Sequence, residues 1–177
     1  MTISSPRASA SASASAVDSA FLAQHLPAAE LIEDHVRAAV EEDLGTGDIT
    51  AALLPATQQA EAEVLTREHA VLSGQAWFAA VFRLLDKDVR IDWLAQDGAR
   101  IEPGQTLCRL SGRLPALLTG ERTALNYLQT LSGTATQARR HADAVAGLPV
   151  RILDTRKTLP GLRREQKYAV LCGCLLY

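Results

Sequence analysis

Residues 150–158 read V-R-I-L-D-T-R-K-T, and this stretch predicts how the C-terminal part of the chain folds. After Pro149 comes a short apolar run that ends at Asp154, a pattern typical of a buried parallel strand. A Thr-Arg-Lys-Thr loop follows, and the spacing then predicts a helix from Arg163 to about Leu171. Because α/β proteins bind ligands at the carboxyl ends of their parallel strands, the stretch predicts a βα unit with a binding loop.

The loop of this unit has the chemistry of an anion site. Arg156 offers a bidentate fork for a carboxylate or phosphate, and Lys157 offers a mobile point charge. Thr155 and Thr158 flank the two cations with hydroxyl groups. The alternative interpretation is a solvated basic loop, because further cations, Lys167 among them, follow in the next helix. Residue types alone leave both interpretations open.

Upstream of this unit, the spacing of the leucines predicts a helix over residues 114–131. Ser132-Gly133-Thr134 is expected to end that helix and to cap a second one over residues 135–145. Glu121 and Arg122 lie on the polar face of the first helix. Taken alone, an exposed helical ion pair is the simplest interpretation of these two residues, since such pairs are common and contribute little.

The preceding part of the chain predicts a small open sheet with two helices. Apolar residues at three- and four-residue spacing predict helices over residues 28–42 and 77–85. Short alternating segments separated by glycine and proline predict an antiparallel sheet or half-barrel. These segments lie at residues 60–66, 70–74, 89–94, 99–102 and 106–112. The expected fold class is therefore mixed, an α+β part followed by an α/β part.

The N-terminal tail is expected to be disordered over residues 1–20. Residues 8–16 alternate Ser and Ala, with no large apolar side chain to offset the entropy of ordering. The tail also lacks the apolar core of a signal peptide. The expected organisation is this tail, a first domain over residues 21–147 and a second over residues 148–177.

The composition argues against several classes of function. A net charge of -2 provides no basic field for nucleic acid, and no apolar stretch approaches the ~18 residues that a membrane span needs. Three cysteines make an odd count, which suits a reducing compartment, so a cytoplasmic location is expected. Cys172 and Cys174 have no second Cys or His pair to complete a zinc site, and no metal ligand is assigned.

Four stretches of the chain together resemble the quinolinate phosphoribosyltransferase family. They are E-E-D-L-G-T-G-D-I-T at 41–50, G-E-R-T-A-L-N-Y-L-Q-T-L-S-G-T-A-T at 120–136, I-L-D-T-R-K-T-L-P-G-L-R at 152–163 and Q-K-Y-A-V-L-C-G at 166–173. Each stretch alone is moderately specific. Their order and spacing agree with the family from about Ala28 to Gly173, which makes the combined resemblance strong.

The resemblance implies a fold and a reaction. The fold is an N-terminal α/β sandwich domain followed by an α/β barrel, of which residues 148–177 would be the first βα unit. The intact family is implied to form homodimers with active sites near the subunit interface. The reaction is phosphoribosyl transfer from phosphoribosyl pyrophosphate to quinolinate with decarboxylation, giving nicotinate mononucleotide for NAD biosynthesis. Mg²⁺ is implied as cofactor, with its ligands outside this chain.

The resemblance also assigns site residues. Arg122 matches the family arginine that reaches into the partner subunit's site to hold quinolinate. Thr155, Arg156 and Lys157 match the quinolinate-binding loop, and Lys157 lies near the reacting centre, where a catalytic role is implied. Quinolinate carries two adjacent carboxylates, so several converging cations are needed to desolvate it. The resemblance therefore favours a functional role for Arg122 over the exposed-pair interpretation.

The sequence departs from the family pattern after Gly173. Family members continue into a glycine-rich stretch that ends in Asn-His-Arg, whereas this chain reads C-L-L-Y over residues 174–177. We expect such a change from a frameshift or premature termination, and we expect the 177-residue chain to be inactive alone. The alternative is a non-catalytic fragment that binds or regulates full-length subunits.

Two other classes of protein also come into consideration. One is a relative of the same architecture that acts on another substrate. The other is a lipoyl- or biotinyl-type carrier module, because D-G-A-R-I-E-P-G-Q-T-L at residues 97–107 resembles the rhythm of such half-barrels. A carrier needs a lysine at a hairpin tip for modification, and no lysine lies between Asp88 and Asp154. The carrier interpretation is therefore disfavoured.

Overall fold

The computed structural model describes residues 18–45, 47–48, 51 and 53–174. The tail expected to be disordered lies outside these residues except for residues 18–20. Those three residues begin helix α1 (Ser19–His25), in which the Asp18 carboxylate accepts a hydrogen bond from the Ala20 amide at 2.9 Å. Aspartate at this position satisfies an amide that the first helical turn leaves unpaired.

The chain forms two small antiparallel sheets, as the alternating segments predict. The larger sheet has the order β1-β5-β3, with strands β1 (Gln59–Leu65), β3 (Arg90–Trp93) and β5 (Thr106–Arg113). The smaller sheet pairs β2 (Ala70–Val71) with β4 (Arg100–Ile101). All pairings are antiparallel, which confirms the predicted small open sheet.

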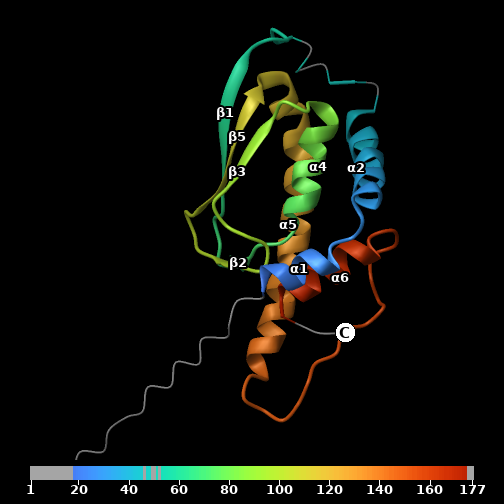
Figure 1. Cartoon of the computed structure of the whole chain (residues 1–177), viewed down its shortest axis with the longest axis vertical. Helices are drawn as coiled ribbons and strands as arrows, with labels where there is room; N and C mark the ends of the chain where they lie inside the picture. The colour runs from blue at the N-terminus through green and yellow to red at the C-terminus, as the bar shows by residue number, and fades with distance from the viewer. Residues whose placement is uncertain (1–17, 46, 49–50, 52, 175–177) are drawn as a thin grey trace, which may run out of the picture.

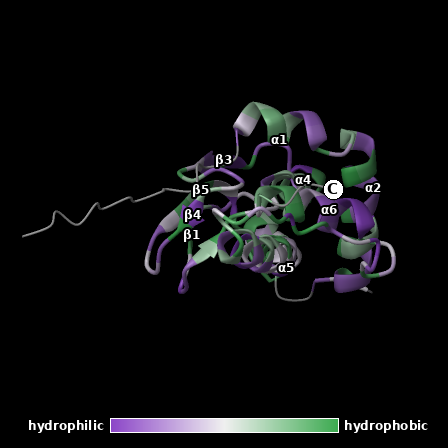
Figure 2. Ribbon diagram, turned by 90° about the horizontal axis from the view of Figure 1, so that it is seen from below, coloured by the Kyte–Doolittle hydropathy of each residue, from purple (hydrophilic) through white to green (hydrophobic). Residues whose placement is uncertain are grey.

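Helices cover one face of the larger sheet (Figure 1). In Figure 1, helices α4 (Gln75–Leu85) and α5 (Leu114–Ala144) lie to the right of the strands, and α2 (Ala29–Leu44) packs on the far side of α4. Helix α4 is apolar nearly all round and lies in the middle of the molecule, where Figure 2 also concentrates hydrophobic residues. None of the helices in the described part of the chain is both long and apolar enough to cross a membrane.

The two faces of the larger sheet differ in chemistry. On the inner face, the Trp93 ring meets Phe78 of α4 edge-on, with ring centroids 5.3 Å apart. On the outer face, Arg109 lies between Glu63 and Asp92 in register, and its Nε donates to Glu63 Oε1 at 2.8 Å. An apolar inner face and a charged outer face are what a sheet covered on one side requires.

Helix α5 corrects the prediction of two helices, because it runs unbroken through residues 132–134. The Ser132 hydroxyl accepts the Ser73 amide at 3.0 Å and donates to the Ser73 carbonyl oxygen at 3.2 Å. One turn later, the Thr136 hydroxyl accepts the Val71 amide at 2.9 Å. The Ser132 hydroxyl, which suggested a helix cap, and that of Thr136 therefore hold the segment at β2 instead, and Gly133 is an ordinary helical residue with open space around it.

The structure also corrects the strand predicted at residues 150–154, because this segment has no regular secondary structure. Val150 and Leu153 are 53% and 65% exposed, so the apolar run is not buried. A parallel strand needs neighbouring strands for its backbone and covering layers for its side chains. Among the described residues no strand pairs with this segment, so only the helix of the predicted βα unit is formed.

That helix, α6 (Arg163–Cys172), docks on α5 and on the N-terminal part of the chain. Its Tyr168 hydroxyl donates to Asp97 Oδ2 at 2.9 Å, and the Tyr168 ring lies 5.5 Å from that of Trp77. Gly173 ends the helix so close to α5 that a Cβ atom there would lie 2.5 Å from the Ala135 carbonyl oxygen. The absence of a side chain at Gly173 therefore permits the close packing of the two helices.

Candidate functional site

The loop that carries the predicted anion-binding residues is tied to α6 by its backbone. Asp154 Oδ1 accepts the Thr155 amide at 2.7 Å, and the Thr155 hydroxyl accepts the Lys157 amide at 3.2 Å. At the other end of the loop, Gln166 Oε1 accepts the Leu159 amide at 2.8 Å. These hydrogen bonds satisfy three backbone amides of the loop. They hold a stretch without secondary structure in one conformation.

Lys167 is the second anchor of this loop. Its Nζ forms an ion pair with Asp154 Oδ2 and donates to the Thr155 carbonyl oxygen at 2.5 Å. The side chains of Lys167 and Asp154 are each only 15% exposed. The solvated-basic-loop interpretation counted Lys167 among the exposed cations, but in the structure its charge is engaged by Asp154 and the side chain is mostly buried.

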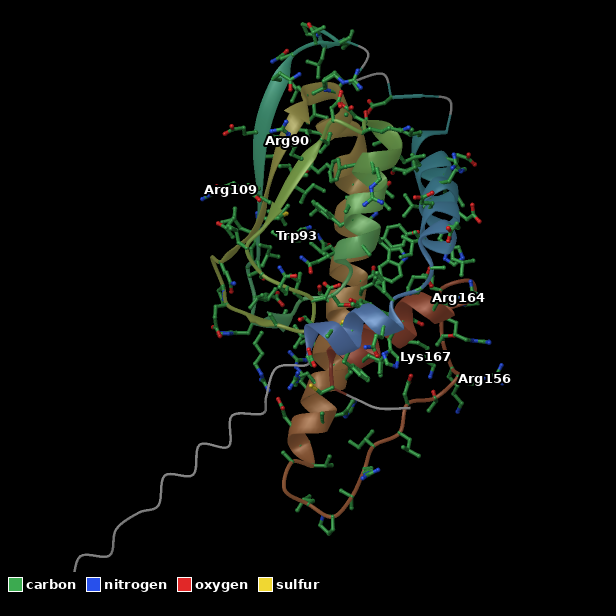
Figure 3. The ribbon with its side chains drawn as sticks, in the orientation of Figure 1. Arg90, Trp93, Arg109, Arg156, Arg164 and Lys167 are labelled. Carbon is green, nitrogen blue, oxygen red and sulfur yellow. The ribbon has the colours of Figure 1, made fainter. Side chains whose placement is uncertain are left out.

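Arg156 and Lys157 have a different environment. Both residues are exposed, and neither side chain forms an ion pair or a hydrogen bond with another described residue. Figure 3 shows Arg156 on the loop at the outer side of α6, with Lys167 closer to the helices. Two neighbouring cations whose charges no described residue neutralises are available to an external anion.

Arg122 lies on α5, where its Nη1 donates to Asp43 Oδ1 of α2 at 2.9 Å. The Arg122 side chain is 74% exposed, whereas that of Asp43 is 21% exposed. A second contact joins the same two regions, because the Thr119 hydroxyl donates to Asp48 Oδ2 at 2.8 Å. Acidic residues near the end of α2, which the helix dipole disfavours, thus serve to join that end of α2 to α5.

Arg122 and the Thr155–Lys157 loop are held by contacts with different helices. Arg122 pairs near the C-terminal end of α2, whereas the Thr155–Lys157 loop is anchored on α6, and no hydrogen bond or ion pair among the described residues joins them. Cations that share one anion need no direct contact with each other, so a dicarboxylate site that includes all four residues stays a prediction.

A cavity of about 460 Å³ lies between α2, α5 and the start of α6. Its walls come from three segments that are distant in the sequence, so local sequence patterns did not predict it. Its polar lining comes from seven residues, namely Glu42, Asp43, Thr123, Asn126, Tyr127, Thr130 and Glu165. The signal available in the sequence was the polar face of α5, on which Asn126 lies one turn beyond Arg122.

Glu165 forms a buried polar contact at this cavity. Its side chain is 1% exposed, and its Oε1 contacts Nδ1 of His35 on α2. The Tyr127 hydroxyl donates to the His35 carbonyl oxygen at 3.1 Å, and burial together with the Glu165 carboxylate raises the pKa of Tyr127 to about 12. His35 and Glu165 are 130 positions apart in the chain, so no local pattern predicted their pairing.

The cysteines and the described acidic residues do not form a nucleophilic or metal site. Burial raises the pKa of the Cys108 thiol and of the Cys172 thiol to about 12, so both stay protonated and unreactive near neutral pH. Within the described ranges, no group of three His, Cys, Asp or Glu side chains is arranged to hold a metal ion. These residues therefore do not fit the Mg²⁺ that the resemblance implies.

Comparisons with known proteins identify both parts of the chain. The model of the quinolinate phosphoribosyl transferase N-terminal domain matches residues 48–132, and the model of the C-terminal domain of the same family matches residues 134–175. The Bacillus subtilis protein named "Probable nicotinate-nucleotide pyrophosphorylase [carboxylating]" is 40% identical over 132 residues, which are 75% of this chain and 46% of that protein. An Arabidopsis thaliana chloroplastic nicotinate-nucleotide pyrophosphorylase [carboxylating] is 37% identical over 140 residues, 78% of this chain and 40% of that protein.

Solved structures agree with this result. The nicotinate-nucleotide pyrophosphorylase from Francisella tularensis superimposes with a TM-score of 0.81 at 39% identity, over 84% of this chain and 54% of that one. The chain therefore spans about half the length of the relatives that it matches. The two matching domain models, in chain order and together covering most of the described residues, show that the chain belongs to the quinolinate phosphoribosyltransferase family.

Proposed function

We propose that the chain carries part of the quinolinate-binding apparatus of a phosphoribosyltransferase that makes nicotinate mononucleotide. The observation that carries this proposal is the anchored loop on α6, which presents the exposed cations Arg156 and Lys157. Relatives named nicotinate-nucleotide pyrophosphorylase [carboxylating] support the same chemistry. The substrates would be quinolinate and phosphoribosyl pyrophosphate.

The loop suits the charge of quinolinate. Two adjacent carboxylates leave water only if cations replace their hydration. Arg156 and Lys157 are neighbours in the chain, and no anionic side chain among the described residues pairs with them. Thr155 adds a hydroxyl group, although this hydroxyl already accepts the Lys157 amide. We assign binding to Thr155, Arg156 and Lys157, and place Lys157 nearest the reacting atoms.

The reaction needs positioning and charge stabilisation. The pyridine nitrogen of quinolinate attacks the anomeric carbon of phosphoribosyl pyrophosphate, and the bond to pyrophosphate breaks as positive charge develops on the ribose. The carboxylate next to the new bond then leaves as CO₂, and its electron pair takes up a proton at the ring carbon. Holding the dicarboxylate in place accounts for much of such an acceleration. Lys157 would stabilise the negative charge of the reactants during these steps.

Arg122 would act in a second copy of the protein. The Arg122 side chain is 74% exposed, and among the described residues it pairs with Asp43, so the guanidinium can reach an adjacent subunit at small cost. We therefore propose a homodimer in which Arg122 of one subunit completes the loop site of the other. We further propose that residues 21–147 form the substrate-binding domain and that residues 148–177 begin the barrel, at a cytoplasmic location.

Complementation tests the proposal. A full-length relative in which the arginine matching Arg122 has been replaced by alanine is mixed with this chain, and nicotinate mononucleotide is measured. Activity should return in the mixture, because the chain supplies Arg122 to the relative's intact loop. The chain carrying Arg122→Ala is the matched control, and return of activity with that control would refute the assignment.

A second candidate function is a fragment that binds full-length subunits without catalysing the reaction. The observation that favours it is the apolar segment after α5, where Leu148, Val150, Leu153 and Leu159 are each more than half exposed. Such a segment favours association. Co-purification of the chain with an intact subunit, followed by loss of that subunit's activity, would distinguish this candidate from the complementing one.

A further inference from the structure

Lys167 of α6 contacts the start of the candidate loop through two different groups. Its Nζ forms an ion pair with Asp154 Oδ2 and donates to the Thr155 carbonyl oxygen at 2.5 Å. The first contact holds a side chain, whereas the second holds the backbone itself, one residue before Arg156. Because the Thr155 carbonyl group and the Arg156 amide belong to one peptide plane, holding that oxygen fixes the orientation of the peptide group that joins the two residues.

The two cations that follow lack a comparable contact among the described residues. The side chains of Arg156 and Lys157 are exposed and form no ion pair or hydrogen bond there. The Lys157 amide donates to the Thr155 hydroxyl at 3.2 Å, so the backbone of Lys157 is tied to the residue that Lys167 holds. The orientation of both cations therefore depends on the backbone of Thr155.

Lys167 also cancels a negative charge beside the binding residues. Asp154 lies two positions before Arg156, and its carboxylate would repel the dicarboxylate proposed for this loop. The side chains of Lys167 and Asp154 are each 15% exposed, so solvent screens their attraction less than it screens that of a fully exposed pair. This pairing leaves the two exposed cations as the net charge that the loop offers to an anion.

We propose that Lys167 is a positioning residue for anion binding by this loop, and that it acts through Thr155 and Asp154 without contacting the ligand. The proposal rests on the function proposed above, because it concerns the same loop. A loop that is already held in one conformation loses less entropy when it binds an anion. Loss of Lys167 therefore weakens anion binding even though Arg156 and Lys157 remain in the chain.

The first measurement is the NMR order parameter of the backbone amides, in the purified chain and in Lys167→Met. The Thr155 and Lys157 amides should fall from a value typical of rigid backbone, about 0.85, to below about 0.6 in the variant. The amides of Tyr168 and Ala169 in α6 should not change. Unchanged order parameters in the loop would overturn the proposal. An equal fall throughout α6 would overturn it as well, because Lys167 would then stabilise the helix rather than position the loop.

The second measurement is the affinity for quinolinate. Lys167→Met should weaken it roughly tenfold, and Lys167→Arg, which keeps the charge and several donors, should bind within about threefold of the unaltered chain. Arg164→Gln removes one positive charge from the exposed side of α6, so it is the matched control and should bind normally. Full affinity in Lys167→Met would overturn the proposal. Absence of binding by the unaltered chain would instead refute the proposed function, and the order parameters would then decide on Lys167.

A double variant keeps the test decisive if Lys167→Met does not fold. Adding Asp154→Asn removes the carboxylate that would be left without its cation, so the double variant should fold. It has the net charge of the unaltered chain but lacks the donor to the Thr155 carbonyl oxygen. Positioning predicts mobile loop amides and about threefold weaker quinolinate binding in this variant. Rigid loop amides, or the affinity of the unaltered chain, would show that Lys167 acts through charge alone and would overturn the proposal.

Discussion

Lys167 and Asp154 form an ion pair in which each side chain is only 15% exposed, and the same ammonium group donates to the Thr155 carbonyl oxygen at 2.5 Å. This arrangement joins the start of the candidate loop to the middle of α6. It makes Lys167 a positioning residue rather than a substrate-binding one. The position of Arg156 and Lys157 therefore depends on a residue ten or more positions further along the chain.

Replacing Lys167 by Met should destabilise the chain by about 2 kcal/mol, because it leaves the Asp154 carboxylate mostly buried without its cation. The free energy of unfolding in urea is the measurement. Arg164→Gln, on the exposed side of the same helix, should change it by less than about 0.5 kcal/mol. Equal stability of Lys167→Met and the unaltered chain would show that the ion pair does not hold the loop.

Gly173→Ala should destabilise the chain by about 2 kcal/mol, because the added Cβ would lie 2.5 Å from the Ala135 carbonyl oxygen and from the Ala138 Cβ. The matched substitution is Gly133→Ala within α5, where nothing lies within 4 Å of the added atom. That change should stabilise the chain by about 0.5 kcal/mol, since alanine favours the helix. Thermal unfolding of both variants checks the predicted opposite signs. A Gly173→Ala chain as stable as the unaltered one would place α6 elsewhere.

Arg122→Ala should change the free energy of unfolding by no more than about 0.5 kcal/mol, because the Arg122–Asp43 pair is largely solvent-screened. Arg113 offers an internal comparison, since its Nε donates to an Asp86 side chain that is only 2% exposed. Arg113→Ala should therefore destabilise the chain more than Arg122→Ala does. A large loss of stability in Arg122→Ala would mean that this arginine is structural and is not held ready for another subunit.

The three cysteines should differ in reactivity. Cys108 and Cys172 are buried with pKa values of about 12, whereas Cys174 is half-buried. A thiol reagent at pH 8 should modify Cys174 first, and the other two only after denaturation, since the thiolate is the reactive form. Mass spectrometry after a short exposure identifies the modified residue. Rapid modification of Cys172 in the folded chain would contradict the packing of α6.

The same buried thiols predict a loss of stability in alkali. Their pKa values rise from 9.0 to about 12 on folding, so the unfolded chain releases these protons at lower pH than the folded chain does. Stability from this source is present below pH 9 and is lost between pH 9 and pH 12. Urea unfolding at pH 8 and pH 10.5 measures the decrease. A Cys108→Ala/Cys172→Ala chain should show a smaller decrease, and an equal decrease would assign it to other groups.

Local pattern predicted most helices and strands, and the failures have identifiable causes. Ser132-Gly133-Thr134 was predicted to cap a helix, but the Ser132 hydroxyl bonds the backbone of Ser73 instead, and α5 continues through these residues. The run at 150–154 has strand composition, yet a buried strand also needs partners that the described residues do not supply. The composition of a segment indicates which secondary structure it favours, whereas strand pairing depends on the segments that lie beside it in the fold.

The sequence also predicted some features of the candidate site and missed others. The types and order of Thr155, Arg156 and Lys157 indicated an anion-binding loop, and the structure shows both cations exposed. The anchoring contact from Lys167 and the His35–Glu165 contact join segments distant in the sequence, so only the tertiary structure reveals them. Whether Arg122 and the loop form one site stays a prediction about an assembly of two chains.

Titration of the purified chain with quinolinate, followed by calorimetry or by NMR of the loop residues, tests the central claim most directly. We predict weak saturable binding that Arg156→Gln reduces roughly tenfold, since one charge-assisted bidentate contact is lost. Arg164→Gln should bind as the unaltered chain does, and nicotinate, with one carboxylate fewer, should bind more weakly. Absence of saturable quinolinate binding, or equal binding by Arg156→Gln, would contradict the assignment of quinolinate to this loop.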